Sequence, residues 1–259
     1  KYPDSKKGMD EYIKNRIEEF LSKEYCCNLD DLQDDGIVFT VKSIVSQPYI
    51  KIMAYRNSVV ICTSHNISEK IKGMLRGKSV DEIFEIPFVY GQTIHYVPDC
   101  AYDYPFGKRT DYDFQLLFDE NILSLQGLEG FGNSLEFDDQ GKTPTRAACI
   151  VRENKKVIGV AGATPTEIAD IWEIGVDVLD EYRNAGWGTR VVCNLTKELL
   201  ERNIIPFYSA SVTNIGSQSV AIRSGYLPVW VDTYGTVLDG SSVYQEILND
   251  LTAKFLSNK

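Results

Sequence analysis

The sequence predicts an α/β (α+β) protein in which a mixed, mostly antiparallel sheet is flanked by helices. Three observations carry this prediction. Several short runs alternate apolar and polar residues between turn residues, which is typical of half-buried strands. Other runs place apolar residues at helical spacing. The chain has 259 residues, 43% of them hydrophobic, which is enough for one large domain or two modest ones.

The N-terminal part is predicted to be an extra α+β region over residues 1–110, followed by a second domain over residues 111–259. Residues 9–24 carry apolar side chains at helical spacing, so we expect an amphipathic helix with one buried face. Residues 37–46 and 49–63 predict strands, because β-branched residues dominate them and turn residues interrupt them. We identify no known family in this region.

A turn-rich, aromatic segment at residues 98–108 marks the expected boundary between the two domains. It contains Tyr102, Tyr104 and Phe106. Ligand sites often lie between two halves of a protein. We therefore expect these aromatic residues to border a cleft.

The second domain is expected to alternate strands, turns and helices. The segment Arg152–Lys155 has the chemistry of a hairpin turn, and Gly225 suits the position just after a helix. The predicted elements are a strand (112–118), helices broken by glycines (120–137), a hairpin (146–151 and 156–163), a third antiparallel strand (170–178), a helix (187–202), a strand (207–212), a helix from Asn214, a strand (227–231) and a terminal helix led by Ser242.

Charge and composition exclude several classes of protein. The net charge is −10, which argues against nucleic acid as a partner, because phosphate contacts need a basic face. An acidic cleft would concentrate amines, although the same charge also serves solubility alone. No run approaches eighteen apolar residues and the N-terminus lacks an apolar signal segment, so we expect no membrane span. Six cysteines without Cys-x-x-Cys spacing favour free thiols in a reducing cytoplasm.

One stretch combines a strand, a glycine-bearing loop and a helix start. The strand 170–178 leads to the loop Arg183–Thr189, and the helical pattern follows directly. Backbone N–H groups at the positive end of a helix dipole bind a pyrophosphate without basic side chains. Of Gly186 and Gly188, one would allow a turn dihedral closed to residues with a Cβ, and the other would let a phosphate approach the backbone.

The spacing Arg-x-x-Gly-x-Gly after a strand resembles the acyl-CoA-binding loop of the GNAT superfamily of N-acetyltransferases. A second motif lies downstream, where Asn214 starts a short helix that ends in Gly225-Tyr226. The segments at residues 174–183, 206–209 and 226–230 are similar to those of the subfamily typified by zwittermicin A N-acetyltransferase. The resemblance covers roughly residues 111–240.

This resemblance implies a GNAT-like fold and acetyl-CoA as co-substrate. It implies that the backbone N–H groups of Val176 and Val178 pair with the pantetheine arm and the thioester oxygen. Arg190 either faces a phosphate or is a surface residue. The expected cofactor-binding residues are Val176, Val178, Arg183, Asn184, Ala185, Gly186, Trp187, Gly188, Thr189, Asn214 and Ser217.

Acetyl transfer to an amine needs a base for the amine, a polarised thioester and a proton for the leaving thiolate. Alternation on strand 170–178 puts Glu173 and Asp177 on one face, roughly 13 Å apart, and Trp172, Ile174, Val176 and Val178 on the other, expected to be core. The resemblance implies that Glu173 is the base, and Asp177 would anchor the substrate. Glu173 could equally be a structural, partly exposed strand carboxylate.

The acid for the thiolate is left open by the sequence. Many members of the superfamily supply a Tyr seven residues after the motif Asn, where this chain has Ala221. Tyr208, Ser217 or Ser219 would have to replace it. Asn214 is also expected to cap its helix.

We predict transfer of an acetyl group from acetyl-CoA to a primary amine of a small molecule by direct attack. The alternatives are a non-catalytic acyl-CoA-binding or sensing domain, which Ala221 favours, and a protein-modifying acetyltransferase. The N-terminal region is expected to shape the acceptor pocket, and a homodimer is one assembly that the sequence allows. His65 and His95 have no ligand partners at helical spacing, so we expect no metal site and two ordinary polar residues.

Overall fold

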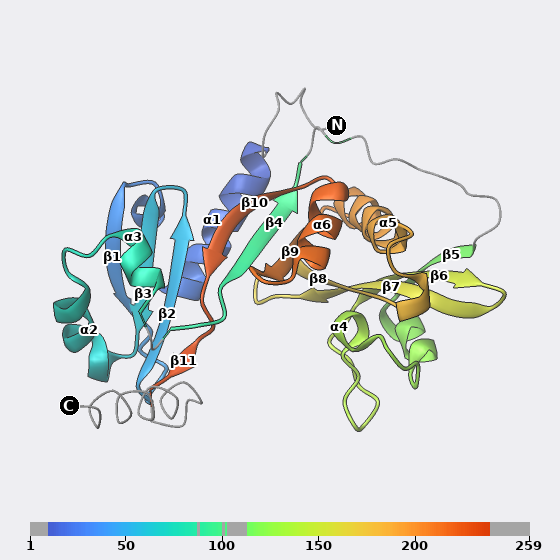
Figure 1. Ribbon diagram of the computed structural model, residues 1–259, viewed down its shortest axis with the longest axis horizontal. Coiled ribbons are helices and arrows are strands. Elements are labelled where there is room, and N and C mark those ends of the chain that lie inside the picture. The colour runs from blue at the N-terminus through green and yellow to red at the C-terminus, as the bar shows by residue number, and fades with distance from the viewer. Residues whose placement is uncertain (1–9, 87–88, 100–101, 103–112, 239–259) are drawn as a thin grey trace, which may run out of the picture. The chain divides into compact units, whose positions relative to one another are not determined.

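The computed structural model describes residues 10–86, 89–99, 102 and 113–238 (Figure 1). The predicted terminal helix after Ser242 lies outside these residues. So do Tyr104 and Phe106 of the predicted boundary segment. Of the residues that are described, no helix has both the length and the apolar character that a membrane span needs.

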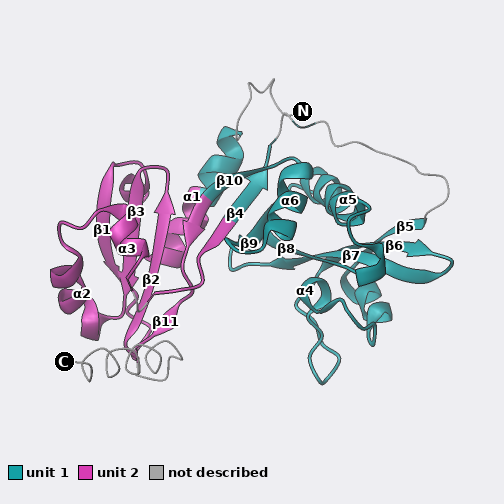
Figure 2. Cartoon of the chain, viewed as in Figure 1, with its two compact units in different colours: residues 1–17, 95–229 teal, residues 18–94, 230–259 magenta. Residues whose placement is uncertain are grey.

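The chain forms two compact units, which Figure 2 shows in different colours. Unit 1 comprises residues 1–17 and 95–229, and unit 2 comprises residues 18–94 and 230–259. This division differs from the predicted boundary near residue 110, because the chain after residue 229 adds strand pairs to the N-terminal sheet. Which segment folds by itself stays a prediction.

Unit 1 is built on a mixed sheet. Strands β5 to β8 follow each other as antiparallel neighbours, and β8 pairs with β9 in parallel. The order is β4–β9–β8–β7–β6–β5, with the start of β10 beside β4. The strands are β4 (Thr93–Pro98), β5 (Asp113–Phe118), β6 (Ala147–Glu153), β7 (Lys156–Pro165), β8 (Ile171–Val178), β9 (Ile205–Ser211) and β10 (Tyr226–Asp232).

The predicted hairpin and its third antiparallel strand are confirmed. The β6–β7 turn consists of Asn154 and Lys155, both with positive φ, as a two-residue hairpin turn requires. Asn tolerates this left-handed conformation better than most residues.

Helix α5 (Trp187–Glu201) covers one face of this sheet, packing on β6, β7 and β8. Its buried stripe includes Val191, Val192, Leu195 and Leu199, so the predicted amphipathic pattern is confirmed. Figure 1 shows α5 and α4 (Gly132–Leu135) on opposite faces of the sheet. Helix α6 (Ile215–Arg223) packs on β9 and α5. Short 3-10 segments lie at Asp119–Leu125 and Asp180–Tyr182.

A pair of glycines lets α4 lie directly on the sheet. Gly162 on β7 pairs with Gly175 on β8. A Cβ on Gly175 would collide with the backbone carbonyl of Asn133, and one on Gly162 with the carbonyl of Ser134. Only glycine allows a backbone to approach this closely. This contact positions the strand that carries Glu173 and Asp177.

Strands β8 and β9 pair only over their first halves. The parallel ladder runs from Ile171–Ile205 to Ile174–Tyr208 and then stops. The second half of β8 therefore has β7 on one edge and no strand ladder on the other. Val176 and Val178 are only partly buried here, and so is Trp172, which corrects the expectation that all three are core residues. Ile174 is buried as expected.

Unit 2 has a smaller sheet with the order β1–β3–β2, to which β11 and the end of β10 add on β2. Strands β1 and β3 are parallel, and β2 and β3 are antiparallel. Its elements are the end of α1 (Glu11–Tyr25), β1 (Gly36–Val41), β2 (Tyr49–Tyr55), β3 (Ser58–Thr63), α2 (Ser68–Leu75), α3 (Val80–Phe84) and β11 (Thr236–Val237), with 3-10 segments at Asp30–Leu32 and His65–Ile67.

A buried polar cluster lies in unit 2, where the end of β10 meets α1 and β2. Tyr25 Oη donates a 2.5 Å hydrogen bond to Asp232, and Lys51 lies 3.0 Å from Glu24 and 3.4 Å from Asp232. Burial, followed by the nearby Asp232 carboxylate, raises the pKa of Tyr25 well above its usual value. Since each buried polar group has partners, this cluster fastens the end of β10 to α1 and β2.

Candidate active site

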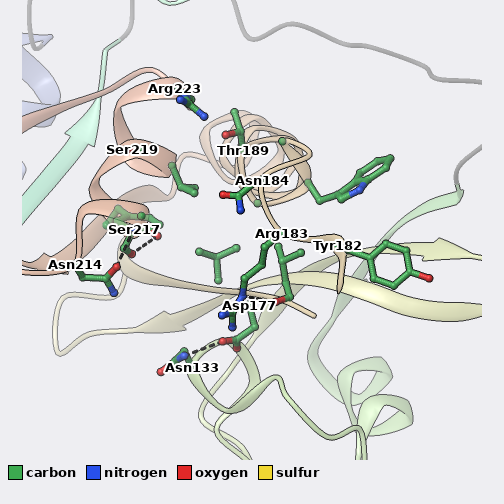
Figure 3. A pocket seen from close by; sticks show the side chains of 18 residues that line it. Asn133, Asp177, Tyr182, Arg183, Asn184, Thr189, Asn214, Ser217, Ser219 and Arg223 are labelled. Atoms are coloured by element: carbon green, nitrogen blue, oxygen red, sulfur yellow. Dashed lines mark hydrogen bonds between the residues drawn. The ribbon is translucent and has the colours of Figure 1, made fainter. Parts of the chain in front are cut away.

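An open groove of about 440 Å³ lies in unit 1 where β8 and β9 part. Figure 3 shows α6 on one side of it, the start of α5 behind it, and Asn133 with Asp177 below. The lining residues are Asn133, Val176, Asp177, Val178, Tyr182, Arg183, Asn184, Gly186, Trp187, Gly188, Thr189, Tyr208, Asn214, Gly216, Ser217, Ser219, Val220 and Arg223.

Most of the residues predicted to bind the cofactor line this groove. Of that set, Ala185 is exposed and does not. Of the three residues predicted to be catalytic, Asp177 and Tyr208 line the groove and Glu173 does not. The structure thus gathers two distant sequence motifs, the loop before α5 and the start of α6, around one cavity.

The groove meets the N-terminus of α5. Gly186 has φ of 82° and Asn184 has φ of 62°, so both take the left-handed turn that the sequence predicts for this loop. No side chain caps the helix at Gly186. The first N–H groups of a helix lack intrahelical acceptors, so they are available to an anion in the groove. Packing also favours glycine at position 188, because a Cβ there would lie 3.3 Å from the Val220 side chain.

Two backbone donors of β8 face the same space. Leu179 N–H donates to Ile158, on the β7 side. Because N–H directions alternate along a strand, those of Val178 and Val176 point away from β7, toward the groove. The carbonyl of Val178 points the same way, since it accepts a 3.1 Å hydrogen bond from Arg183 Nε.

Asp177 is already occupied by donors from α4. Its carboxylate accepts hydrogen bonds from Asn133 Nδ2 at 2.7 Å, Ser134 N at 2.8 Å and Ser134 Oγ at 2.8 Å. Three donors satisfy most of what a carboxylate can accept. These hydrogen bonds indicate that Asp177 holds α4 on β8, and they argue against Asp177 as the anchor of a substrate.

Glu173 is exposed and is held by a different set of residues. Ser209 Oγ donates a 2.5 Å hydrogen bond to Glu173 Oε1, and His95 Nδ1 lies 2.8 Å from Ser209 Oγ. His95 is 9% exposed and its ring packs on Phe207 with centroids 6.0 Å apart. The prediction that His95 is an ordinary polar residue missed this link, because β4, β8 and β9 become neighbours only in the folded sheet.

Tyr208 is buried between β9 and α6. Its hydroxyl lies 2.7 Å from Ser217 Oγ, while Asn214 caps α6 by accepting a 3.0 Å hydrogen bond from Ser217 N–H. Burial raises the pKa of Tyr208 to about 12, the Ser217 hydrogen bond opposes the rise, and Asp177 adds to it. Ala221 is fully buried, and its methyl group cannot donate a proton at that helix position.

Cations line the groove on two sides. Arg223 extends from α6 and Arg183 from the loop, where its guanidinium also pairs with Asp180 at 2.9 Å (Figure 3). Arg190 does not line the groove. Its guanidinium stacks on the Trp187 ring at 5.0 Å, and its Nη1 is buried without a hydrogen-bond partner in the described part of the chain.

Sequence reasoning did not assign a site role to five residues of the lining. Arg223 belongs to the second motif and follows Ser219 by one helical turn, so helical periodicity alone would have found it. Asn133 carries no such signal, because it reaches the groove only through the Gly162–Gly175 contact. The five residues are Asn133, Tyr182, Gly216, Val220 and Arg223.

Comparison with known proteins bears on the same segment. Residues 114–226 match the acetyltransferase (GNAT) family. The match spans both motifs and strands β5 to β9, which is less than half of the chain. It does not reach the finer zwittermicin A subfamily. No curated protein matches the chain.

Solved structures of GNAT proteins are similar to this chain at low sequence identity. A GNAT-family protein from Novosphingobium aromaticivorans is 13% identical over 55% of this chain and 63% of its own, with a TM-score of 0.43. A GCN5-related N-acetyltransferase-like protein from Streptococcus suis is 17% identical over 87% of this chain and 99% of its own, with a TM-score of 0.47.

A Salmonella typhimurium protein solved with its cofactor acetyl-CoA is 11% identical over 50% of this chain and 96% of its own, with a TM-score of 0.34. The 63% of the Novosphingobium protein that this chain covers is less than two thirds of that protein's length. The predicted fold class, a mixed, mostly antiparallel sheet flanked by helices, is confirmed.

Proposed function

We propose that this chain transfers the acetyl group of acetyl-CoA to a primary amine of a small molecule. The observation that carries the proposal is the groove in which the uncapped start of α5 and the free edge of β8 meet. One end supplies N–H donors for a pyrophosphate, and the other supplies Val176 and Val178 N–H for the pantetheine arm and the thioester oxygen. Arg183 and Arg223 add positive charge for the phosphates.

In the proposed reaction Glu173 takes a proton from the substrate ammonium. The freed nitrogen lone pair attacks the thioester carbon, a C–N bond forms, and the C–S bond breaks with its electron pair leaving on sulfur. The nitrogen loses its second proton to water or to the departing thiolate, which leaves a neutral amide. Glu173 is exposed, so a substrate has access to it. It lies on β8, three residues before the first of the two backbone donors.

Protonation of the leaving thiolate draws little help from this protein. A thiol of ordinary pKa, about 8.5, is a much stronger acid than a phenol, so transfer from Tyr208 runs uphill. The CoA thiolate then takes its proton from water, or the Tyr208–Ser217 pair stabilises it by a hydrogen bond without transferring the proton. Base-assisted attack becomes the larger contribution of the protein.

A second candidate function is acyl-CoA binding or sensing without catalysis. The buried Ala221 favours it, because this position offers no acid. Both functions require the same groove, and only turnover separates them. The location in a cell and the homodimer stay predictions.

The decisive experiment follows CoA thiol release across a panel of primary amines, with calorimetry of acetyl-CoA binding alongside. Gly188→Asp should abolish binding by placing a charge at the helix start, whereas Gly188→Ala adds only the Cβ and should weaken it less. Turnover with at least one amine supports the enzyme. Binding without turnover supports the sensor, and absence of binding rejects both.

Glu173→Gln is the test of the base. A general base is worth about 10²–10⁴-fold, so kcat/KM should fall by ~10² or more. The amide oxygen can still accept the Ser209 hydrogen bond, and acetyl-CoA affinity should hardly change. Unchanged turnover in this variant would remove Glu173 from the mechanism.

A further inference from the structure

Glu173 is one end of a chain of hydrogen bonds that runs across three neighbouring strands. Glu173 lies on β8, Ser209 on β9 and His95 on β4, and these strands are adjacent in the sheet. The two links measure 2.5 Å between Glu173 Oε1 and Ser209 Oγ, and 2.8 Å between Ser209 Oγ and His95 Nδ1.

Proton counting fixes the direction of this chain. An ionised carboxylate only accepts hydrogen bonds, and a serine hydroxyl has one hydrogen to donate. The Ser209 hydrogen therefore goes to Glu173 Oε1. His95 must then donate from Nδ1–H to Ser209 Oγ, which selects the tautomer with the hydrogen on Nδ1.

We propose that Ser209 and His95 are positioning residues that hold the Glu173 carboxylate in one orientation for the proposed reaction. Oε1 is occupied by the serine, and Oε2 is left to accept the proton of the substrate. This inference rests on the proposed function, because it requires Glu173 to act as the base.

Burial explains why the chain can hold an exposed side chain. His95 is 9% exposed and packed on Phe207, so its imidazole has little freedom to turn. Ser209 is half-buried on the same strand as Phe207, two residues on and therefore on the same face. A rigid partner reduces the conformations of Glu173, and misplacement of a catalytic group by about 1 Å can cost 10²-fold in rate.

Steady-state kinetics of paired variants test the inference. Ser209→Ala should lower kcat by about 10- to 100-fold, with both KM values within about twofold. Ser209→Thr keeps the hydroxyl and should retain most of the activity. His95→Ala should resemble Ser209→Ala, whereas His95→Asn keeps an N–H near the Nδ1 position and should rescue. Ser211→Ala is the matched control on β9, since its hydroxyl bonds only locally to Thr213.

A double-mutant cycle separates this inference from the proposed function. In the Glu173→Gln background, Ser209→Ala should cause no further loss, because Ser209 acts through Glu173. Equal activity of Ser209→Ala and the parent protein would overturn the inference alone. A further loss in the double variant would overturn it too. A Glu173→Gln variant as active as the parent would instead overturn the base, and the inference with it.

One measurement does not depend on activity. The chain has two histidines, so a His65→Gln variant leaves a single imidazole for nitrogen-15 NMR. The expected spectrum shows hydrogen on Nδ1 of His95, and Ser209→Ala should change that signal. A His95 that carries its hydrogen on Nε2 alone would overturn the inference even if the enzyme lacks a known acceptor.

Discussion

The Asp177 carboxylate accepts hydrogen bonds from Asn133 and Ser134, so an incoming ammonium would have to compete with donors already in place. Asp177→Asn puts an NH₂ group against at least one of these donors. Leaving a buried or half-buried donor unpaired costs about 1–3 kcal/mol, and we expect a loss of this size in urea unfolding. Asp139→Asn, at an exposed position, is the control.

An anchoring role for Asp177 would give a different result. The free energy of unfolding would then stay close to that of the parent, and the acceptor KM would rise with little change in kcat. That outcome would contradict the fastening role assigned from the geometry.

Tyr208 is the second residue whose environment decides its chemistry. Because burial raises its pKa to about 12, the phenol keeps its proton across the range in which most enzymes are assayed. Any fall in kcat between pH 8 and pH 10 should therefore persist unchanged in Tyr208→Phe. Since proton transfer to a thiolate runs uphill, this variant should lose less than about tenfold in kcat, below the usual 10²–10⁴ for an acid.

Turnover of Tyr208→Phe across this pH range, with a pH-stable amine, measures the effect. A loss of a hundredfold or more would show that Tyr208 supplies the proton after all. Tyr234→Phe, which removes the same hydroxyl at an exposed position outside the groove, is the matched control.

At the scale of elements, the site depends on how closely α4 approaches β7 and β8. Gly175→Ala would drive its Cβ into the carbonyl of Asn133, which is backbone and cannot rotate away. Overpacking of this kind costs about 1–3 kcal/mol. We expect that loss in chemical unfolding, together with weakened hydrogen bonds from α4 to Asp177.

Gly132→Ala provides the matched control within α4. A Cβ at Gly132 meets nothing within 4 Å, and alanine favours helix over glycine by up to about 1 kcal/mol. This variant should be neutral or slightly stabilised. Equal stability of Gly175→Ala and Gly132→Ala would show that α4 does not rest on the glycine pair.

At the scale of the whole molecule, an ion pair links the first turns of α1 to a residue of unit 1 far along the sequence. Arg16 Nε donates to Asp170 Oδ2 at 2.9 Å, and Arg16 Nη2 also contacts this carboxylate. These hydrogen bonds, ahead of the opposing effect of burial, hold the pKa of Asp170 below its usual value. Residues 1–17 thus group with strands that lie far along the sequence.

This pair predicts how stability changes with pH. A carboxyl whose pKa is lowered on folding stabilises the protein fully above its unfolded pKa of about 3.9, and the contribution is lost as pH falls below it. Asp170→Asn should therefore lower the melting temperature at pH 7, and the difference from the parent should shrink below about pH 4. A difference that is the same at pH 7 and pH 3 would contradict this.

Local signals determined the elements and the glycine-bearing loop before α5. The stripe on α5, the turn at Asn154–Lys155, the positive φ of Gly186 and the cap at Asn214 depend on neighbours within a few residues. Helical periodicity, turn dihedrals and capping all operate at that range, which is why the sequence alone located most of the groove lining.

Only the tertiary structure decided which partners the two carboxylates have. Glu173 meets Ser209 and His95 because β4, β9 and β8 are neighbours in the sheet, and Asp177 meets α4 because two glycines lie opposite each other. The division into units likewise depends on β10 and β11 returning to β2. The order of the strands in the sheet brings together residues about 40 to 180 positions apart in the sequence. The residue pattern within one segment cannot predict this strand order.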